Sequence, residues 1–242
     1  MSDSFNLKHW LDHFCHKIRE SKKCLAVFDI DSTLYDVSPR TEKILQEFAH
    51  HPMYNSNFPK ASEILKKTQI LPSDWGYREA FERHDLLEEP HEFHHSLKEF
   101  WTDKFFSNHY LHLDNPYEGA VQFVNKLYDT GASIAYLTGR DFPRMGEGTH
   151  RILKESGFPV NPPRAEVALK PSKGLDDARF KCDWFISVLD KYDEICFFEN
   201  EPVNINWIQE YCPKVEIIYF DSTHSGLANP PFHLPTITDY KI

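Results

Sequence analysis

The stretch that decides the fold is Val27-Phe28-Asp29-Ile30-Asp31-Ser32-Thr33-Leu34. It continues an apolar run that starts at Leu25, and such a run predicts a buried strand. Because residues i and i+2 of an extended chain point the same way, Asp29 and Asp31 present two carboxyl groups where the strand leaves the sheet. Open α/β sheets bind their ligands at this end of their strands.

Two carboxylates this close repel one another unless a cation neutralises them or one keeps its proton. A hard divalent cation such as Mg²⁺ prefers oxygen ligands, and beside it Asp29 can act as a nucleophile and Asp31 as a proton carrier. The alternative is a turn after a buried strand, with Asp31 or Ser32 capping the bend.

Length and composition narrow the class of protein. A chain of 242 residues can bury one substantial core and still carry an insertion. Its formal net charge of −10 argues against a nucleic-acid partner and against binding to an anionic membrane. No apolar run is long enough to span a bilayer and no targeting pattern is recognisable, so we expect a cytoplasmic protein. The five cysteines lack the spacing of a disulfide framework or a zinc site, which favours reduced, mostly buried thiols.

Strand and helix patterns alternate in the second half of the chain. They predict an α/β fold, a Rossmann-like doubly wound parallel sheet with helices on both faces. After the first strand, the expected strands are 133–137, 165–169, 195–198 and 215–220. The expected helices are 4–20, 118–129, 149–156, 177–189 and 203–211. We expect the tail after Asp221, which is rich in proline, to be irregular and to lie along the surface.

A helical segment interrupts this alternation. We interpret 35–40 as a turn, and from Thr41 the periodicity is helical for about seventy residues, with helices around 44–49, 64–65, 74–87 and 90–105. The predicted organisation is therefore a core of residues 1–39 and 113–242, with an α-helical cap inserted at 40–112.

A second group of polar residues follows the strand at 133–137. The hydroxyl of Thr138 and the backbone amides of Gly139 and Arg140 are suited to hold phosphoryl oxygens. The alternative is that Thr138 only caps a turn that Gly139 permits.

These two stretches resemble the first two motifs of the haloacid dehalogenase-like phosphohydrolases. Asp29-x-Asp31-x-Thr33 after a hydrophobic strand matches the first, and Leu137-Thr138-Gly139-Arg140 is a frequent form of the second. In that family a helical cap often lies between the two, which is the position of residues 40–112.

The resemblance implies a third motif, a lysine that neutralises the nucleophile and the incoming phosphate. Lys170, Lys173 and Lys181 are the choices, and the family pattern favours Lys181, which follows Phe180 and precedes Glu199 by 18 positions. Lys170 and Lys173 remain alternatives, although each is more simply a solvated surface residue.

The fourth motif would be Glu199 with Asn200 and Asn204, where relatives usually carry aspartates. A glutamate offers the same oxygen ligand on a longer side chain, and an asparagine can hold a metal-bound water or bind through its carbonyl. Which of the two asparagines supports the metal is open, and Glu199 as a helix cap is the alternative.

By resemblance, Mg²⁺ is held by the Asp29 carboxylate, the Asp31 main-chain carbonyl and Glu199. Asp29 attacks phosphorus to form an aspartyl phosphate, Asp31 exchanges protons with the leaving group and water, and Lys181 and Thr138 stabilise the transferring group. The resemblance thus implies a phosphatase acting on a small phosphorylated metabolite. A phosphotransferase or phosphomutase with the same motifs, and a non-catalytic binding module that kept the fold, are the alternatives. The sequence leaves open the substrate, the oligomeric state and any role of His224.

Overall fold

The computed structural model describes residues 5–242. The chain divides into two compact units, one formed by Met1–Tyr35 with Pro116–Ile242 and the other by Asp36–Asn115. In the described residues, no helix combines the length and apolar character that crossing a membrane requires. The function of the helical unit as a cap stays a prediction.

The first unit is built on a six-stranded sheet with strand order β5-β4-β1-β6-β7-β8. All pairings between these strands are parallel. This confirms the predicted α/β class with a Rossmann-like sheet. The strands are β1 Cys24–Phe28, β4 Ser133–Asp141, β5 Ala165–Lys170, β6 Glu194–Glu199, β7 Glu216–Phe220 and β8 Thr236–Ile237. A separate two-stranded sheet pairs β2 Tyr35–Asp36 with β3 Asn115–Pro116.

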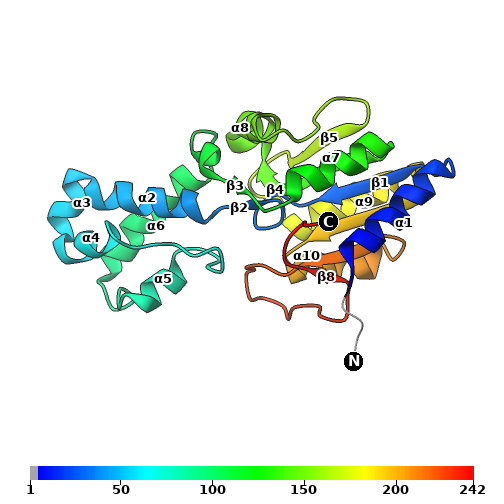
Figure 1. The fold of residues 1–242 in the computed structure, drawn as a ribbon. Helices are drawn as coiled ribbons and strands as arrows, with labels where there is room; N and C mark the ends of the chain where they lie inside the picture. Colours follow the sequence, from blue (N-terminus) through cyan, green and yellow to red (C-terminus); the bar gives the residue numbers. More distant parts are fainter. Residues whose placement is uncertain (1–4) are drawn as a thin grey trace. The chain divides into compact units, whose positions relative to one another are not determined.

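Helices cover both faces of the six-stranded sheet, as Figure 1 shows. They are α1 Leu7–Arg19, α7 Ala120–Thr130, α8 Phe142–Glu155, α9 Asp177–Val188 and α10 Pro202–Tyr211, with a short 3₁₀ turn η2 at Leu189–Lys191. Helices α1 and α7 pack together, and so do α9 and α10. Because side chains alternate along a strand, Phe28 of β1 meets Phe123 of α7, whereas Leu25 and Val27 face the cluster under α9 and α10.

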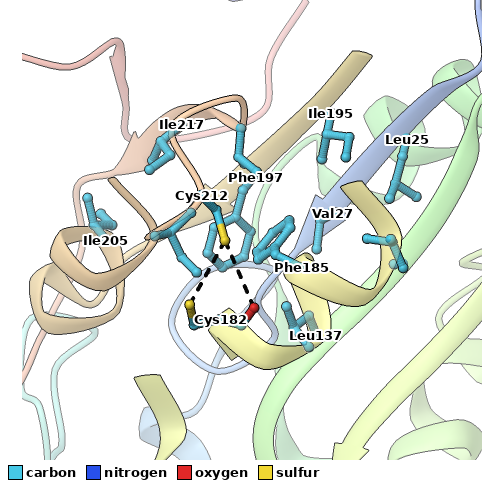
Figure 2. Packing of buried hydrophobic residues seen from close by; sticks show 14 of the residues in the cluster. Leu25, Val27, Leu137, Cys182, Phe185, Ile195, Phe197, Ile205, Cys212 and Ile217 are labelled. Carbon is cyan, nitrogen blue, oxygen red and sulfur yellow. Dashed lines mark hydrogen bonds between the residues drawn. The ribbon is translucent and has the colours of Figure 1, made fainter. Parts of the chain in front are cut away.

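The cluster under α9 and α10 is almost entirely apolar and includes two thiols (Figure 2). The sulfurs of Cys182 and Cys212 lie 3.9 Å apart without forming a disulfide. All five cysteines are free and buried. Burial raises the pKa of Cys212 to about 12, so its thiol stays protonated.

The second unit is all helical. It contains α2 Ser38–His50, α3 Pro52–Asn57, α4 Pro59–Leu65, α5 Arg78–Arg83, α6 His91–Phe105 and a 3₁₀ turn η1 at Tyr110–Leu113. Its core is aromatic, with the ring of Phe48 stacked on Tyr54 and set edge-on to Phe93 and Phe100. An ion pair between Arg40 and Asp114, 2.9 Å long, is fully buried in this unit.

Several predicted boundaries were wrong. The expected turn at 35–40 contains β2 and the start of α2, whose first turn accommodates Pro39 because the amides there need no intrahelical partner. The expected helix 74–87 is reduced to α5, since Asp85 takes a left-handed φ of 55°. Helix α8 begins at Phe142 and not at Thr149, because Asp141 caps it by accepting from the amide of Arg144.

The tail after Asp221 also departs from the prediction. Strand β8 adds to the edge of the sheet beside β7, and Tyr240 is fully buried. Its ring packs against Phe28, Phe123, Phe198 and Phe220. Part of the tail therefore completes the core and does not lie on the surface.

Candidate active site

The chain turns sharply where β1 ends. The amide of Asp29 still donates to the carbonyl of Phe198 on β6, at 3.0 Å. Beyond it, the carbonyl of Ile30 accepts from the amides of residues 33–35, and Ser32 has a left-handed φ of 58°. This turn holds Asp29 and Asp31 at the carboxyl end of the central strand.

Lys181 joins the ends of two neighbouring strands. Its Nζ lies 2.5 Å from Asp29 Oδ1 and 2.6 Å from Glu199 Oε2. Phe28 and Phe198 are register partners in β1 and β6, so Asp29 and Glu199 each follow a member of that pair. All three side chains are buried, with Lys181 supplied by α9. The structure thus brings three of the predicted site residues together at one edge of the sheet.

The buried charges shift one another's ionisation. Burial raises the pKa of Asp29 to about 8; the charge of Lys181 opposes this effect, and Glu199 and Asp31 add to it. Burial alone would lower the pKa of Lys181, but Asp29 and Glu199 outweigh it and hold that pKa above its usual value. Lys181 is therefore a cation at neutral pH, and it contacts two acidic side chains.

Both oxygens of the Glu199 carboxylate accept hydrogen bonds. Its Oε1 accepts from the amides of Asn200 and Glu201, both at 3.0 Å, and its Oε2 also accepts from Asn204 Nδ2 at 3.1 Å. The residue that caps α10 is Glu201, whose side chain accepts from the amide of Val203. Glu199 is thus part of the buried cluster, and Asn204 orients it.

Asn200 has a different setting from Asn204. Its Oδ1 accepts from the hydroxyl of Thr33 at 2.9 Å, and its Nδ2 donates to the carbonyl of Thr223 at 2.6 Å. The side chain therefore ties the turn after β1 to the segment after β7. His224 follows in that segment, and its Nδ1 accepts from the amide of Gly226 at 3.1 Å.

Thr138 and Gly139 lie where β4 departs from regular pairing. Two β4 residues, Gly139 and Arg140, stand between the register pairs Thr138 with Leu169 and Asp141 with Lys170. Thr138 is fully buried, and its Oγ1 accepts from the amide of Arg140 at 3.2 Å. A Cβ at Gly139 would overlap the carboxylate of Asp177, so only glycine fits this position without movement.

The other two candidate lysines contact different partners. Lys170 forms an ion pair with Asp177 and donates to the carbonyl of Leu175 at 3.0 Å. Lys173 is exposed. Of the three, Lys181 is the lysine that the structure places on Asp29.

Arg140 contacts a residue that sequence reasoning did not connect to it. Its Nε and Nη2 donate to Asp31 Oδ2 and Oδ1, both at 2.8 Å, and the arginine side chain is 1% exposed. From the sequence, the backbone amide of Arg140 was expected to hold phosphoryl oxygens, and no partner was expected for the guanidinium. The two residues are 109 positions apart, so no local pattern predicts their ion pair. An arginine at a strand end near two carboxylates is the one general indication that such a pair could form.

Fold and site together define a Rossmann-like α/β protein with an acidic, lysine-containing cluster at the carboxyl ends of its parallel strands. The chain belongs to the haloacid dehalogenase-like hydrolases, because the model of that family matches residues 25–162, more than half of its length. The matched segment contains Asp29, Asp31 and Thr138, whereas Lys181 and Glu199 lie beyond it.

Solved structures resemble the chain at low sequence identity. A candidate phosphatase from Clostridium difficile superposes with a TM-score of 0.50 at 13% identity, covering 82% of this chain and 85% of that one. A hydrolase of the haloacid dehalogenase superfamily from Ehrlichia chaffeensis gives 0.49 at 10% identity, with coverages of 90% and 93%. Among curated proteins the sequence has no match. At these identities the likeness is one of fold.

Proposed function

We propose that the protein is a Mg²⁺-dependent phosphatase that hydrolyses a small phosphorylated metabolite through an aspartyl phosphate on Asp29. The observation that carries the proposal is the position of Lys181 Nζ between Asp29 Oδ1 and Glu199 Oε2. A buried carboxylate beside a fixed cation is the arrangement expected of a nucleophile that must approach an anionic phosphate. Membership of the hydrolase family supports the same reaction class.

The residues at the strand ends fit a hard divalent cation. Asp29 and Glu199 both contact a single lysine, Lys181, and Asp31 adds a further carboxyl group beside them. Burial raises the pKa of Asp29 to about 8, and a further cation beside it would favour its ionised form. Within residues 5–242, no three His, Cys, Asp or Glu side chains are grouped as a metal site. Mg²⁺ does not need such a group, because it binds one or two carboxylates and keeps several waters.

We therefore propose Asp29, the Asp31 carbonyl and Glu199 as the metal ligands. Asn204 supports Glu199 through its hydrogen bond. Both the oxygen and the nitrogen of the Asn200 side-chain amide already form hydrogen bonds. We therefore propose that Asn200 holds the turn after β1 and does not bind the metal directly. Bound Mg²⁺ would supply positive charge to the phosphate oxygens and to the nucleophile.

The reaction has two displacements in this proposal. A carboxylate oxygen of Asp29 forms a bond to phosphorus while the bond from phosphorus to the ester oxygen breaks, and Asp31 gives that oxygen a proton. Water then attacks phosphorus, the bond to Asp29 breaks, and Asp31 takes the proton from the water. Lys181 stays charged throughout and stabilises the oxygens of the transferring group.

Thr138 and Gly139 are the proposed contacts of the phosphoryl oxygens. The Thr138 hydroxyl already accepts one hydrogen bond, from the amide of Arg140, so its own proton is directed elsewhere. The absence of a side chain at Gly139 lets the backbone approach closely, as phosphate sites commonly require.

The test is hydrolysis of p-nitrophenyl phosphate with and without Mg²⁺, by the wild type and by Asp29→Asn. We expect turnover that needs the metal and falls at least about 10⁴-fold in the variant, because the nucleophile is lost. Absence of turnover in the wild type with Mg²⁺, Mn²⁺ and Co²⁺ would contradict the proposal and favour a binding module. Transfer of phosphate to an added alcohol or sugar in place of water would identify a phosphotransferase.

A further inference from the structure

Arg140 is placed to control Asp31 and not to meet a substrate. Its Nε and Nη2 both donate to the carboxylate of Asp31, and its Nη1 lies 3.3 Å from the hydroxyl of Thr149 on α8. All three nitrogens of the guanidinium are therefore engaged. The arginine side chain is 1% exposed, whereas that of Asp31 is 32% exposed. Solvent and ligands reach the carboxylate and not the cation behind it.

The geometry of the pair fixes the orientation of Asp31. Two parallel N–H donors to two carboxylate oxygens hold the plane of the carboxylate, which a single contact to a lysine does not do. The irregular pairing of β4 at Gly139 and Arg140 brings the arginine to this position, and such irregularities re-aim side chains at sheet edges. The contact with Thr149 then fixes the guanidinium from the side of α8.

We infer that Arg140 is a positioning residue that holds the Asp31 carboxylate in the orientation needed to give a proton to the leaving group and to take one from water. The inference rests on the proposed function. It concerns the guanidinium of Arg140, whereas the predicted contact with substrate was made by the backbone amide. Thr149 supports the guanidinium in this position.

The consequence is a defect that depends on the leaving group. An ester with a poor leaving group needs the proton from Asp31 more than an ester with a good one does. A disturbed Asp31 therefore slows phenyl phosphate more than p-nitrophenyl phosphate. A residue that binds the phosphoryl group, or one that only stabilises the fold, would change both esters by the same factor.

The experiment measures kcat/KM for both esters in wild type, Arg140→Gln and Asp31→Asn, with Mg²⁺ present. For Arg140→Gln we expect a loss of about 10-fold with p-nitrophenyl phosphate and about 10²-fold with phenyl phosphate, within the contribution of general acid–base catalysis. Arg140→Lys should show the same trend with smaller losses. In the double variant Arg140→Gln with Asp31→Asn, kcat/KM should be within about 3-fold of its value in Asp31→Asn alone, because both changes remove the same proton transfer.

The matched control is Arg144→Gln. Arg144 also pairs with an aspartate on the same edge of the sheet, through Nε at 2.7 Å and Nη2 at 2.5 Å, both to Asp141 Oδ2. Its ratio of the two kcat/KM values should equal that of the wild type. Thr149→Val should change the ratio in the same direction as Arg140→Gln does. If Arg140→Gln does not fold, Thr149→Val and Arg140→Lys provide the test in its place.

A second readout follows a single turnover. With p-nitrophenyl phosphate the first displacement slows by only about 10-fold in Arg140→Gln, while the second slows further because a misoriented Asp31 takes the proton from water poorly. We expect a burst of about one nitrophenol per site, absent from Arg144→Gln, with phosphate trapped on Asp29 in acid-quenched protein.

Equal losses with both esters, a raised KM with unchanged kcat, or losses that multiply in the double variant would each overturn the inference while leaving an active phosphatase. A wild type that turns over neither ester would instead defeat the proposed function, and the inference with it.

Discussion

The two units each bury an ion pair, and the two pairs differ in their charge balance. In the helical unit, Arg40 pairs with Asp114, and its guanidinium also lies 3.9 Å from the centre of the Phe105 ring. In the α/β unit, Lys181 serves two carboxylates at once. Two carboxyl groups on one lysine make the cluster of Asp29, Lys181 and Glu199 unbalanced in charge, and such a cluster favours a further cation. The contrast is between an ion pair in a helical core and a candidate site at the ends of the strands.

The largest expected effect comes from removing the cation of the unbalanced cluster. Lys181→Met should lower kcat for p-nitrophenyl phosphate by about 10³-fold or more, the range reported for cations that stabilise a transferring phosphoryl group. Lys170→Met and Lys173→Met are matched controls, because those lysines do not contact Asp29, and each should stay within about 10-fold of wild type. A larger loss in Lys170→Met than in Lys181→Met would reverse our assignment of the motif lysine.

Breaking the pair of Arg40 and Asp114 should lower stability and leave the chemistry unchanged. Arg40→Met removes the guanidinium from the buried Asp114 carboxylate, which costs about 3–5 kcal/mol of unfolding free energy. Adding Asp114→Leu should recover most of that loss, since replacing both partners by apolar groups removes the uncompensated charge. Urea titrations of the two variants measure both values. Failure of the second change to restore stability would show that the pair does more than balance charge.

Gly139 tests how closely the edge of β4 is packed. A methyl group at Gly139→Ala would overlap the carboxylate of Asp177 and displace it from Lys170. We expect a loss of at most about 1 kcal/mol in unfolding free energy, because Asp177 is half exposed and can turn away at the cost of its ion pair. Asp177→Ser in the same chain shortens the opposing side chain and should return part of the loss. If the double variant is as unstable as Gly139→Ala, backbone conformation and not Asp177 limits the position.

The smallest expected effect concerns pH. Burial acts to raise the pKa of Asp141, but hydrogen bonds from the side chain and amide of Arg144 outweigh it and hold the pKa below its usual value. The stabilisation is therefore present above the unfolded pKa of about 3.9 and is lost as pH falls through the lower folded value. Against Asp141→Asn, the wild type should be more stable by about 1 kcal/mol at pH 6, and the difference should shrink towards pH 3. Thermal melts across that range would contradict this if the difference stays constant.

Local patterns were sufficient for most of the α/β unit. The buried run at 25–28 and the glycine after α7 each mark an element whose identity depends on neighbours in sequence. The start of α8 was missed because glycines at 146 and 148 obscure the helical pattern that Asp141 begins. Tyr240 was placed on the surface because the proline-rich segment before it carries no periodicity, and only the assembled sheet offers the aromatic rings that bury it.

The candidate site shows the same division. The types of residue at the strand ends could be read from the sequence, since each follows a recognisable strand. The pairing of Arg140 with Asp31 could not, because it depends on the irregular register of β4 against β5. The hydrogen bond from the Asn200 side chain to the carbonyl of Thr223 could not be predicted either, because the segment after β7 has no regular pattern.

The central position of β1 has a consequence for synthesis. Its hydrogen-bonding neighbours are β4 and β6, which leave the ribosome more than a hundred residues later. Until then the nascent chain displays an apolar strand with both edges open, the kind of segment that invites association between chains. Lys22 and Lys23 on one side and Asp29 and Asp31 on the other place charges at both ends of that strand. The carboxylates of the candidate site can thereby also protect the unfinished polypeptide from aggregation.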